Sequence, residues 1–302
     1  MISRTLIAFS LLLSCSYTLA LELSPRQWSH LPTGLNFGGM GYAYVEADIN
    51  FDPVLELADV EMESELWLGK YIHTFALFDR SARIDITQGY QEAEWTGLLQ
   101  DEPAKATRNG PTDTFVRFSS NLYGAPALQG KDFAAYRAAN SNDTIVGFGL
   151  VLRLPTGDYH DKRLLNLGGN RYVLRPQLGI SRQHGPWTLE ATTEASLFFD
   201  NDEFFDGNKL EQDPLYIVHA HLIYTFRPGL WVSASAGYDY GGESTLNGQS
   251  KDDTKQNTGW SLRGAIPISR TLGINIAYVS TRTEEDTGAD IESLLASFAY
   301  MW

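Results

Sequence analysis

Two histidines placed two residues apart, His219 and His221, come closest to the spacing of a metal site. Alternate residues of a β-strand project from the same face, so the two imidazole rings would lie about 7 Å apart and could bind one ion. A third ligand would have to come from a neighbouring strand, for example Glu190 or Asp239. No motif supplies that ligand. We therefore expect histidines that hydrogen-bond on the polar face of their strand, and no metal or other cofactor.

Charged side chains recur at alternate positions in several segments, which would place them on one face of each strand. The residues expected to line the interior of a barrel are Arg117, Arg153, Arg171, Arg175, Glu190, Glu194, His219, His221, Asp239 and Arg263. Neighbouring strands lie about 4.8 Å apart, so the arginines at 171 and 175 would reach the glutamates of the next strand. Two interpretations stay open. The ladder is either a constriction whose transverse field orients a polar or aromatic solute, or a network that neutralises buried charges and stiffens the barrel.

The enzymatic alternative is an outer-membrane phospholipase or deacylase, which needs a serine and a histidine on its lipid-facing surface near the outer leaflet. The alternation places His219 and His221 on the interior face, and no serine and histidine with an acidic or amide partner stand out on the other face. The pattern does not assign His73 to a face. We expect no enzymatic activity. Replacement of His73 by alanine would abolish the activity of a hydrolase but leave the conductance of a channel almost unchanged.

About twelve segments, each of roughly ten to fifteen residues, would position these side chains by alternating apolar with small or polar residues. They are residues 36–49, 63–78, 82–95, 112–122, 144–154, 171–183, 187–199, 215–226, 230–240, 259–266, 272–280 and 291–302. Strands of soluble proteins usually have about five or six residues, whereas a tilted strand needs about nine to eleven to cross a bilayer. The lengths predict an all-β, closed antiparallel transmembrane barrel. A secreted β-sandwich is the alternative.

Tight turns alternate with longer polar connections, as in outer-membrane barrels with short periplasmic turns and long extracellular loops. The tight turns are expected at residues 79–80, 184–186, 227–229 and 269–270. The exception is residues 123–142, a long connection on the periplasmic side with a short predicted helix near residues 132–137. This connection or residues 21–33 could fold into the barrel. The sequence leaves open whether the lumen is open or plugged.

Aromatic residues mark the membrane boundaries and one outer loop. The last segment alternates to the C-terminus through Phe298, Tyr300 and Trp302, which predicts an aromatic girdle and a signal for the barrel assembly machinery. Phe204 and Phe205 lie within an acidic outer loop and are expected to form an apolar entry site. For the acidic loops themselves we expect a solvated surface, with binding of divalent cations as the alternative.

The overall composition excludes several classes of protein. Lys and Arg total 23 against 37 Asp and Glu in 302 residues, a net charge of −14 that argues against nucleic acid as a partner. The mean hydropathy is −0.23, and no apolar run outside the N-terminus is long enough for a membrane helix, which excludes a helical membrane bundle.

The N-terminus predicts export from the cytoplasm. A basic residue, Arg4, precedes a short apolar stretch and a small-residue cleavage site, which predicts a signal peptide over residues 1–20. A periplasmic N-terminal segment would follow over residues 21–35, and the barrel would occupy residues 36–302. Lipidation of Cys15 is the alternative. If the signal peptide is removed, the mature chain has no cysteine, which excludes thiol catalysis and cysteine-ligated metals.

Short motifs in the second half of the chain resemble a known bacterial family. The run Pro155-Thr156-Gly157-Asp158-Tyr159 is followed by Leu165-Asn166-Leu167-Gly168-Gly169-Asn170-Arg171, and Glu211-Gln212-Asp213-Pro214-Leu215 and Phe226-Arg227-Pro228-Gly229-Leu230-Trp231 come later in the same order. These motifs are similar to those of the phenol meta-degradation pathway proteins, often called transporters. The resemblance is strong over residues 124–302 and implies an outer-membrane barrel that passes aromatic or other hydrophobic compounds.

Together these features predict a passive outer-membrane channel for small compounds that are aromatic or hydrophobic. The expected partners are the small-molecule solute, outer-membrane lipid and lipopolysaccharide, and the barrel assembly machinery through the C-terminal strand. The barrel enzyme acting on lipid is the alternative function.

Overall fold

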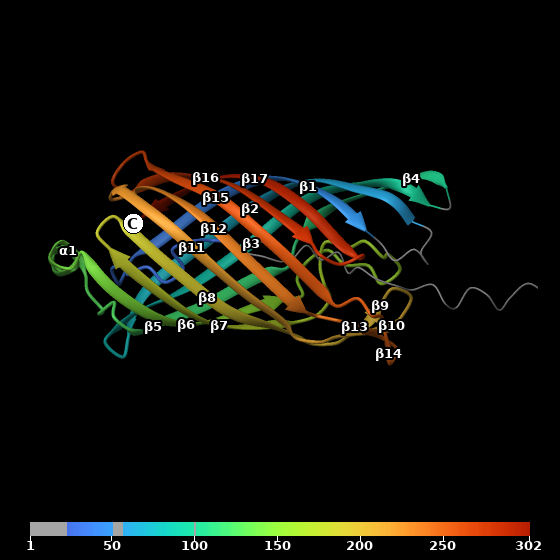
Figure 1. Ribbon diagram of the computed structural model, residues 1–302, viewed down its shortest axis with the longest axis horizontal. Coiled ribbons are helices and arrows are strands. Elements are labelled where there is room, and N and C mark those ends of the chain that lie inside the picture. The colour runs from blue at the N-terminus through green and yellow to red at the C-terminus, as the bar shows by residue number, and fades with distance from the viewer. Residues whose placement is uncertain (1–22, 51–56, 100) are drawn as a thin grey trace, which may run out of the picture.

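Twelve long antiparallel strands form a closed ring (Figure 1), which confirms the predicted barrel and its strand number. The computed structural model describes residues 23–50, 57–99 and 101–302, so the predicted signal peptide and Cys15 lie outside the described residues. In ring order the strands are β1 (Asn36–Asn50), β2 (Leu57–Leu77), β3 (Arg80–Leu99), β5 (Thr114–Tyr123), β6 (Asn142–Leu154), β7 (Val173–His184), β8 (Trp187–Phe198), β11 (Leu215–Arg227), β12 (Leu230–Gly241), β15 (Lys255–Pro267), β16 (Leu272–Thr283) and β17 (Gly288–Met301). β1 pairs with both β2 and β17, which closes the ring.

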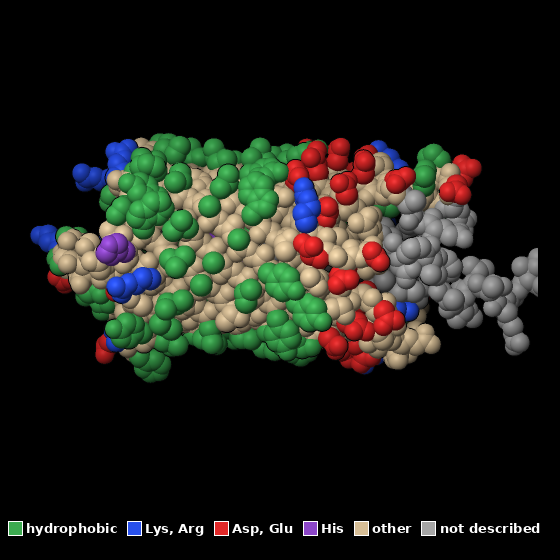
Figure 2. Space-filling view, in the orientation of Figure 1, with side chains coloured by type: hydrophobic (Ala, Val, Ile, Leu, Met, Phe, Trp, Pro, Cys, Tyr) green, Lys and Arg blue, Asp and Glu red, His purple; other side chains and the backbone are tan. Residues whose placement is uncertain are grey.

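The strands alternate between an apolar exterior and a largely polar interior. On β11 the outward side chains Tyr216, Val218 and Leu222 are 60%, 51% and 48% exposed, whereas His219 and His221 between them are buried. Exposed apolar side chains occur on the strands around the ring, and on the face shown in Figure 2 they form a band with acidic side chains gathered at one end of it. A single sheet has no second layer to cover this band, so acyl chains must cover it.

One strand continues the sheet beyond the ring. β3 pairs with β5 through residues 82–87 and with β4 (Glu102–Pro111) through residues 90–99. The hairpin of β3 and β4 therefore projects at the end of the long loops (Figure 1). The sequence predicts a connection over residues 96–111, because prolines and charged residues interrupt the apolar alternation there.

The two ends of the barrel differ as the connection lengths predict. Tight turns join β2 to β3, β7 to β8 and β11 to β12, and the predicted short helix is present as α1 (Gly130–Ala139) at the same end. At the opposite end a small sheet is formed by β9 (Asn201–Phe204), β10 (Asn208–Gln212), β13 (Ser244–Leu246) and β14 (Gln249–Ser250). In the described part of the chain, no helix is long and apolar enough to cross a membrane.

Residues 23–35, here called the N-terminal strap, lie inside the barrel. Trp28 is 1% exposed and its indole Nε1 donates a 2.9 Å hydrogen bond to Thr192 Oγ1. The backbone N–H of Gln27 donates a 2.9 Å hydrogen bond to Glu190 Oε1. Both partners are buried on the inward face of β8. We expected a periplasmic segment over residues 21–35, with folding of residues 21–33 into the barrel as the alternative. The described part follows this alternative, because its polar groups find partners on the inner wall.

Three glycines make room for the indole of Trp28. Gly147 of β6 lies opposite Gly179 of β7, and Gly149 follows on the same face. A Cβ atom on Gly179 would lie 1.8 Å from Trp28 Nε1, and one on Gly147 would lie 2.1 Å from Trp28 Cε3. The strap therefore depends on the absence of side chains at these positions.

We predict that Gly179→Ala expels Trp28 from this seat, because a methyl group and the indole would occupy the same space. The loss of the hydrogen bond to Thr192 and of the packing should make the strap accessible to protease at least about tenfold faster, as expected for a loss of about 1.4 kcal/mol or more. Gly264→Ala is the matched control, since its Cβ would meet no atom closer than 3.9 Å. Equal protection of the strap in both variants would contradict the prediction.

Candidate functional site

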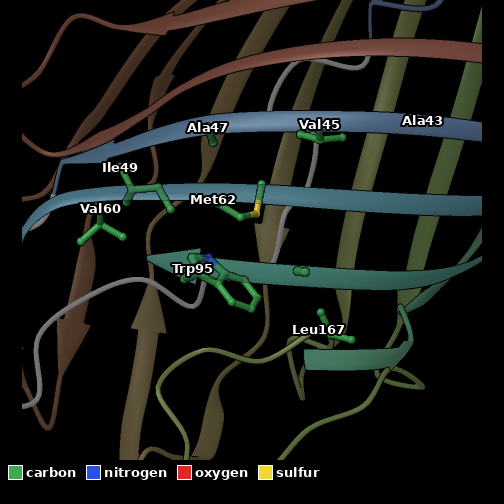
Figure 3. Packing of buried hydrophobic residues seen from close by; sticks show 9 residues of the cluster. Ala43, Val45, Ala47, Ile49, Val60, Met62, Trp95 and Leu167 are labelled. Carbon is green, nitrogen blue, oxygen red and sulfur yellow. The ribbon is translucent and has the colours of Figure 1, made fainter. Parts of the chain in front are cut away.

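An apolar wall lines one side of the bore at its outer half (Figure 3). The residues of this apolar stripe are Ala43, Val45, Ala47, Ile49, Val60, Met62, Ala93, Trp95 and Leu167, with Leu66 packed against them. All but Leu167 come from the inward faces of β1, β2 and β3, where Ile49 lies opposite Val60 and Ala43 lies opposite Leu66. The inner face of a wet barrel is ordinarily polar. The strand alternation alone would place polar residues at these inward positions, so the apolar stripe needs a separate explanation.

The loop between β6 and β7 completes the stripe from above the bore. Its anchor is Asp113, whose carboxylate accepts hydrogen bonds from Arg153 Nε at 2.6 Å, Gly157 N at 2.8 Å and Gly169 N at 2.9 Å. A Cβ on Gly157 would lie 2.7 Å from the Cα of Gly168, so two strands of the loop touch through glycine backbones. This fold carries Leu167 across the bore onto the stripe.

Asp113 was not among the predicted site residues, whereas its partner Arg153 was. Asp113 is 2% exposed and binds both glycine-containing runs that carry the family resemblance, residues 155–159 and 165–171. Glycines in both runs were the available signal, since they indicate a close approach of backbone to a partner. The sequence did not show which side chain that partner would be.

Only half of the predicted charge ladder forms. Arg175 Nη2 lies 2.5 Å from Glu194 Oε1, and Gln177 Nε2 also donates to Glu194. Arg171 instead donates to Gln212 and lies over the ring of Phe198 at 4.7 Å. Burial lowers the pKa of Arg171 to about 10, so this arginine stays protonated at neutral pH.

Glu190, expected to pair with an arginine, binds the strap. Its two carboxylate oxygens accept the backbone N–H groups of Gln27 at 2.9 Å and Trp28 at 3.4 Å. A carboxylate accepts such bonds well because they are charge-assisted. Glu190 therefore holds the strap against β8, and the strap occupies the place expected for a cross-strand ion pair.

His219 and His221 bond to each other. Their Nδ1 and Nε2 atoms are 2.8 Å apart, and His221 Nδ1 lies 2.7 Å from Ser235 Oγ. These contacts agree with the expected hydrogen-bonding histidines. The proposed third ligands lie elsewhere: Glu190 holds the strap, and Asp239 accepts a 2.7 Å bond from Asn257. Within residues 23–50, 57–99 and 101–302, no group of three or more His, Cys, Asp or Glu side chains is suited to a metal ion.

The remaining predicted residues fall on three surfaces. Asp239 is fully buried on the inner face, and Arg263 shares the face of buried Ser261. Phe204 is 2% exposed and packs in the small outer sheet with Leu210, Leu246, Leu164 and Phe205. Phe298, Tyr300 and Trp302 project outward and are 47%, 48% and 55% exposed. Their suggested roles in entry and assembly stay predictions.

The structure assigns His73 to the outer face near the periplasmic end. Its Nδ1 lies 2.9 Å from Asn36 Oδ1, and its ring stacks on Phe75 with centroids 6.2 Å apart. This end is opposite to the outer leaflet, where a barrel hydrolase would meet its lipid substrate. The position gives the enzymatic alternative no support.

A cluster of charges follows the apolar stripe deeper in the bore. Asp85 of β3 is paired with Arg83 Nε at 3.2 Å, Lys70 Nζ at 3.7 Å and Arg117 Nη1 at 3.9 Å. We call these four residues the Asp85 cluster. Sequence analysis identified only Arg117, because the other three lie on segments whose inward faces it did not assign.

A polar pocket lies between the strap and the wall at the periplasmic side of this cluster. Its lining comes from the strap and from β2, β3 and β5, and includes Gln27, Ser29, Thr74, Ser81, Arg83, Ser119 and Asn121. Asn121 Nδ2 donates a 2.8 Å hydrogen bond to Ser81 Oγ. The stripe, the Asp85 cluster and this periplasmic pocket share the side of the bore formed by β1, β2, β3 and β5.

Asp113→Asn is predicted to release the loop of residues 155–171 from the outer mouth. The substitution leaves the buried Arg153 without its carboxylate, which costs about 3–5 kcal/mol when a buried ion pair is broken. Hydrogen exchange at the amides of Gly157 and Gly169 should rise by at least about a hundredfold. Asp158→Asn is the control, because Asp158 is a half-exposed carboxylate of the same loop whose ion-pair partner is His160 at 3.6 Å. Unchanged protection in Asp113→Asn would contradict this anchoring.

Comparisons with known proteins agree with this architecture. The chain is similar to a solved outer membrane channel from Pseudomonas putida F1, with 19% sequence identity, a TM-score of 0.75, and coverage of 93% of this chain and 100% of that chain. The translocator domain of the autotransporter NalP from Neisseria meningitidis is 11% identical, with a TM-score of 0.52 and coverage of 90% of each chain. At these identities the similarity shows a shared outer-membrane barrel fold. A search of curated proteins finds no significant match.

The family resemblance seen in the sequence is also confirmed. A family model described as "Putative MetA-pathway of phenol degradation" matches residues 54–290, which is well over half of the chain. The match includes both glycine-containing runs that bind Asp113 and all three strands that carry the Asp85 cluster. The chain therefore belongs to the family of the MetA-pathway of phenol degradation.

Proposed function

We propose that the protein is a passive outer-membrane channel for the uptake of small aromatic or other hydrophobic compounds. The observation that carries this proposal is the apolar stripe on an inner wall that is otherwise polar. An apolar solute gains about 25 cal/mol for each Å² of apolar surface that it removes from water. The side chains of the stripe are at most 7% exposed beneath Leu167, so a solute would contact them by displacing this leucine, and its apolar surface would then stay out of water.

The stripe runs in the direction that uptake requires. It begins with Ile49 and Val60 at the outer end of their strands and continues inward through Met62 to Leu66. Leu68 follows on the same face of β2, next to the Asp85 cluster. The solute would move down its gradient along this wall and would need no cofactor.

The strap touches β2 only at the periplasmic end, where residues 32–35 bond to Thr74, and its residues 23–28 are anchored on the opposite wall. Arg26 donates a 2.6 Å hydrogen bond to Thr225 Oγ1 and lies 4.8 Å from the ring of Trp231. Ser261 Oγ donates to the carbonyl of Leu23. These anchors, like Glu190 and Thr192, belong to β8, β11, β12 and β15. The proposed exit is the periplasmic pocket, between the strap and β2, β3 and β5.

The outer surface has its own proposed partners. The apolar band would contact lipid and the inner part of lipopolysaccharide. Phe298, Tyr300 and Trp302 would present the C-terminal strand to the barrel assembly machinery, as their outward positions on β17 and at the C-terminus allow. Phe205 would contribute to entry at the outer mouth.

Uptake of labelled toluene into proteoliposomes that carry lipopolysaccharide in the outer leaflet tests the channel. Wild-type protein should raise the rate above that of protein-free vesicles. Leu66→Asn should lower the protein-dependent rate roughly tenfold, because an amide in place of the alkyl group removes about 1.4 kcal/mol of apolar contact from the solute path.

Leu66→Met is the matched control, since it keeps the volume and apolar character of the side chain. Retention of the folded, heat-modifiable form on electrophoresis would show that each variant still forms a barrel. Toluene uptake no faster than in protein-free vesicles would overturn the proposed function.

A further inference from the structure

We propose that the Asp85 cluster is a binding site for the carboxylate of a small solute with an apolar body, such as an aromatic monocarboxylate. This inference rests on the proposed channel and names the chemical class of its cargo. Lys70, Arg83 and Arg117 would bind the carboxylate, and the apolar stripe would hold the rest of the molecule.

The distribution of charge favours an anionic cargo. The chain has a net charge of −14, but many of its acids face outward, including Glu46, Glu61, Glu63 and Glu92, which alternate with buried residues. Acidic side chains gather toward one end on the face shown in Figure 2. On the inner wall the balance is reversed. On the inward faces of the described strands the basic residues are Lys70, Arg83, Arg117, Arg153, Arg175 and Arg263, and the acidic ones are Asp85, Glu190, Glu194 and Asp239. A bore in which basic side chains outnumber acidic ones attracts anions, because the sign of the charges that line a pore determines which ions it favours.

Within the bore, the Asp85 cluster is where cations exceed carboxylates most clearly. Three cations face Asp85, which is only 3% exposed. Arg153 and Arg175, by contrast, each have a carboxylate partner at 2.6 Å or less. The other carboxylate near the cluster is Glu190, whose oxygens accept the N–H groups of the strap. With Asp85 and Glu190 set against Lys70, Arg83 and Arg117, one positive charge remains, which a bound carboxylate would neutralise.

The ion pairs of the cluster are loose. The contacts of Lys70 and Arg117 with Asp85, at 3.7 and 3.9 Å, exceed hydrogen-bond length. Arg83 Nε makes no hydrogen bond among the described residues, although it lies 3.2 Å from Asp85 Oδ1. Lys70 and Arg83 keep donor capacity that a carboxylate can use, because arginine and lysine form their strongest hydrogen bonds with ionised oxygens. Arg117, whose Nε donates a 2.9 Å hydrogen bond to Gln177 Oε1, adds its positive charge.

The cluster is also accessible from the bore. Lys70 lies on the inward face of β2, yet 43% of its side chain is exposed. Arg83 lines the periplasmic pocket, and the guanidinium of Arg117 lies 5.1 Å from the Trp28 ring of the strap. A solute at the cluster would thus have the apolar stripe on its outer side, the strap beside it and the polar exit below. This order suits an amphiphilic anion whose apolar end and charged end need different surroundings.

Reversal potentials across planar bilayers containing the full chain test this inference. In a gradient of potassium benzoate at neutral pH, wild-type protein should pass benzoate in preference to potassium, and potassium hexanoate should behave in the same way. Lys70→Glu and Arg83→Gln should each lower the permeability ratio of benzoate to potassium about tenfold, because each removes a charge-assisted donor. Benzylamine, a cation of similar size, should be less permeant than benzoate in wild type.

Lys105→Gln is the matched control. Lys105 lies on β4 outside the ring and pairs with Glu94 Oε1 at 2.6 Å, so its loss should leave the ratio unchanged. A wild-type preference for potassium or benzylamine would overturn the carboxylate site, as would equal ratios in wild type and in both bore variants. In those cases toluene uptake would still support the channel. A protein that neither conducts nor takes up toluene would overturn the channel and the site together.

Discussion

Closure of the sheet is the constraint on which the rest of this structure depends. In hydrocarbon an unpaired backbone N–H or C=O costs several kcal/mol, so the strands must bond to one another around a complete ring. The pairing of β1 with β17 meets that requirement. Closure then separates two environments, because the period of two along each strand directs alternate side chains to lipid and to the bore. The apolar exterior and the polar interior are two consequences of the same closed hydrogen-bond network.

A polar interior creates a second requirement, which the strap and the outer loop help to satisfy. Buried polar groups are costly unless they are bonded, and Glu190 and Thr192 find their partners in the strap. Asp113 similarly joins Arg153 to the backbone of the loop above the bore. Residues 23–28 of the strap bond to one side of the bore, and on the opposite side apolar residues lead to the cations of the Asp85 cluster. The proposed transport path follows from this asymmetry between the two sides.

The barrel could be predicted from the sequence, but several elements of the site could not. Local alternation assigns His219 and Glu194 to the interior, because the residues on either side of each in its own strand are apolar or small and face outward. Arg171 does not pair with a glutamate of β8, because it precedes β7, where Val173 lies opposite Phe198, whereas Glu190 lies opposite Ser181. Glu190 instead bonds Trp28, which is 162 residues away in sequence. The Asp85 cluster was recognised only through Arg117. The strand of Lys70 carries apolar residues on both faces, so its alternation was too weak to separate inside from outside.

The sequence by itself determined the class of fold, the number of strands, the lipid-facing surface and the family, because these depend on a short-range pattern and on local motifs. Only the tertiary structure decided what fills the bore. Three glycines on two strands form the seat of Trp28, and residues from β2, β3 and β5 form the Asp85 cluster. Such contacts depend on which strands face each other across a closed ring and on the volume that their side chains leave. That information is distributed over distant parts of the chain, and no local pattern contains it.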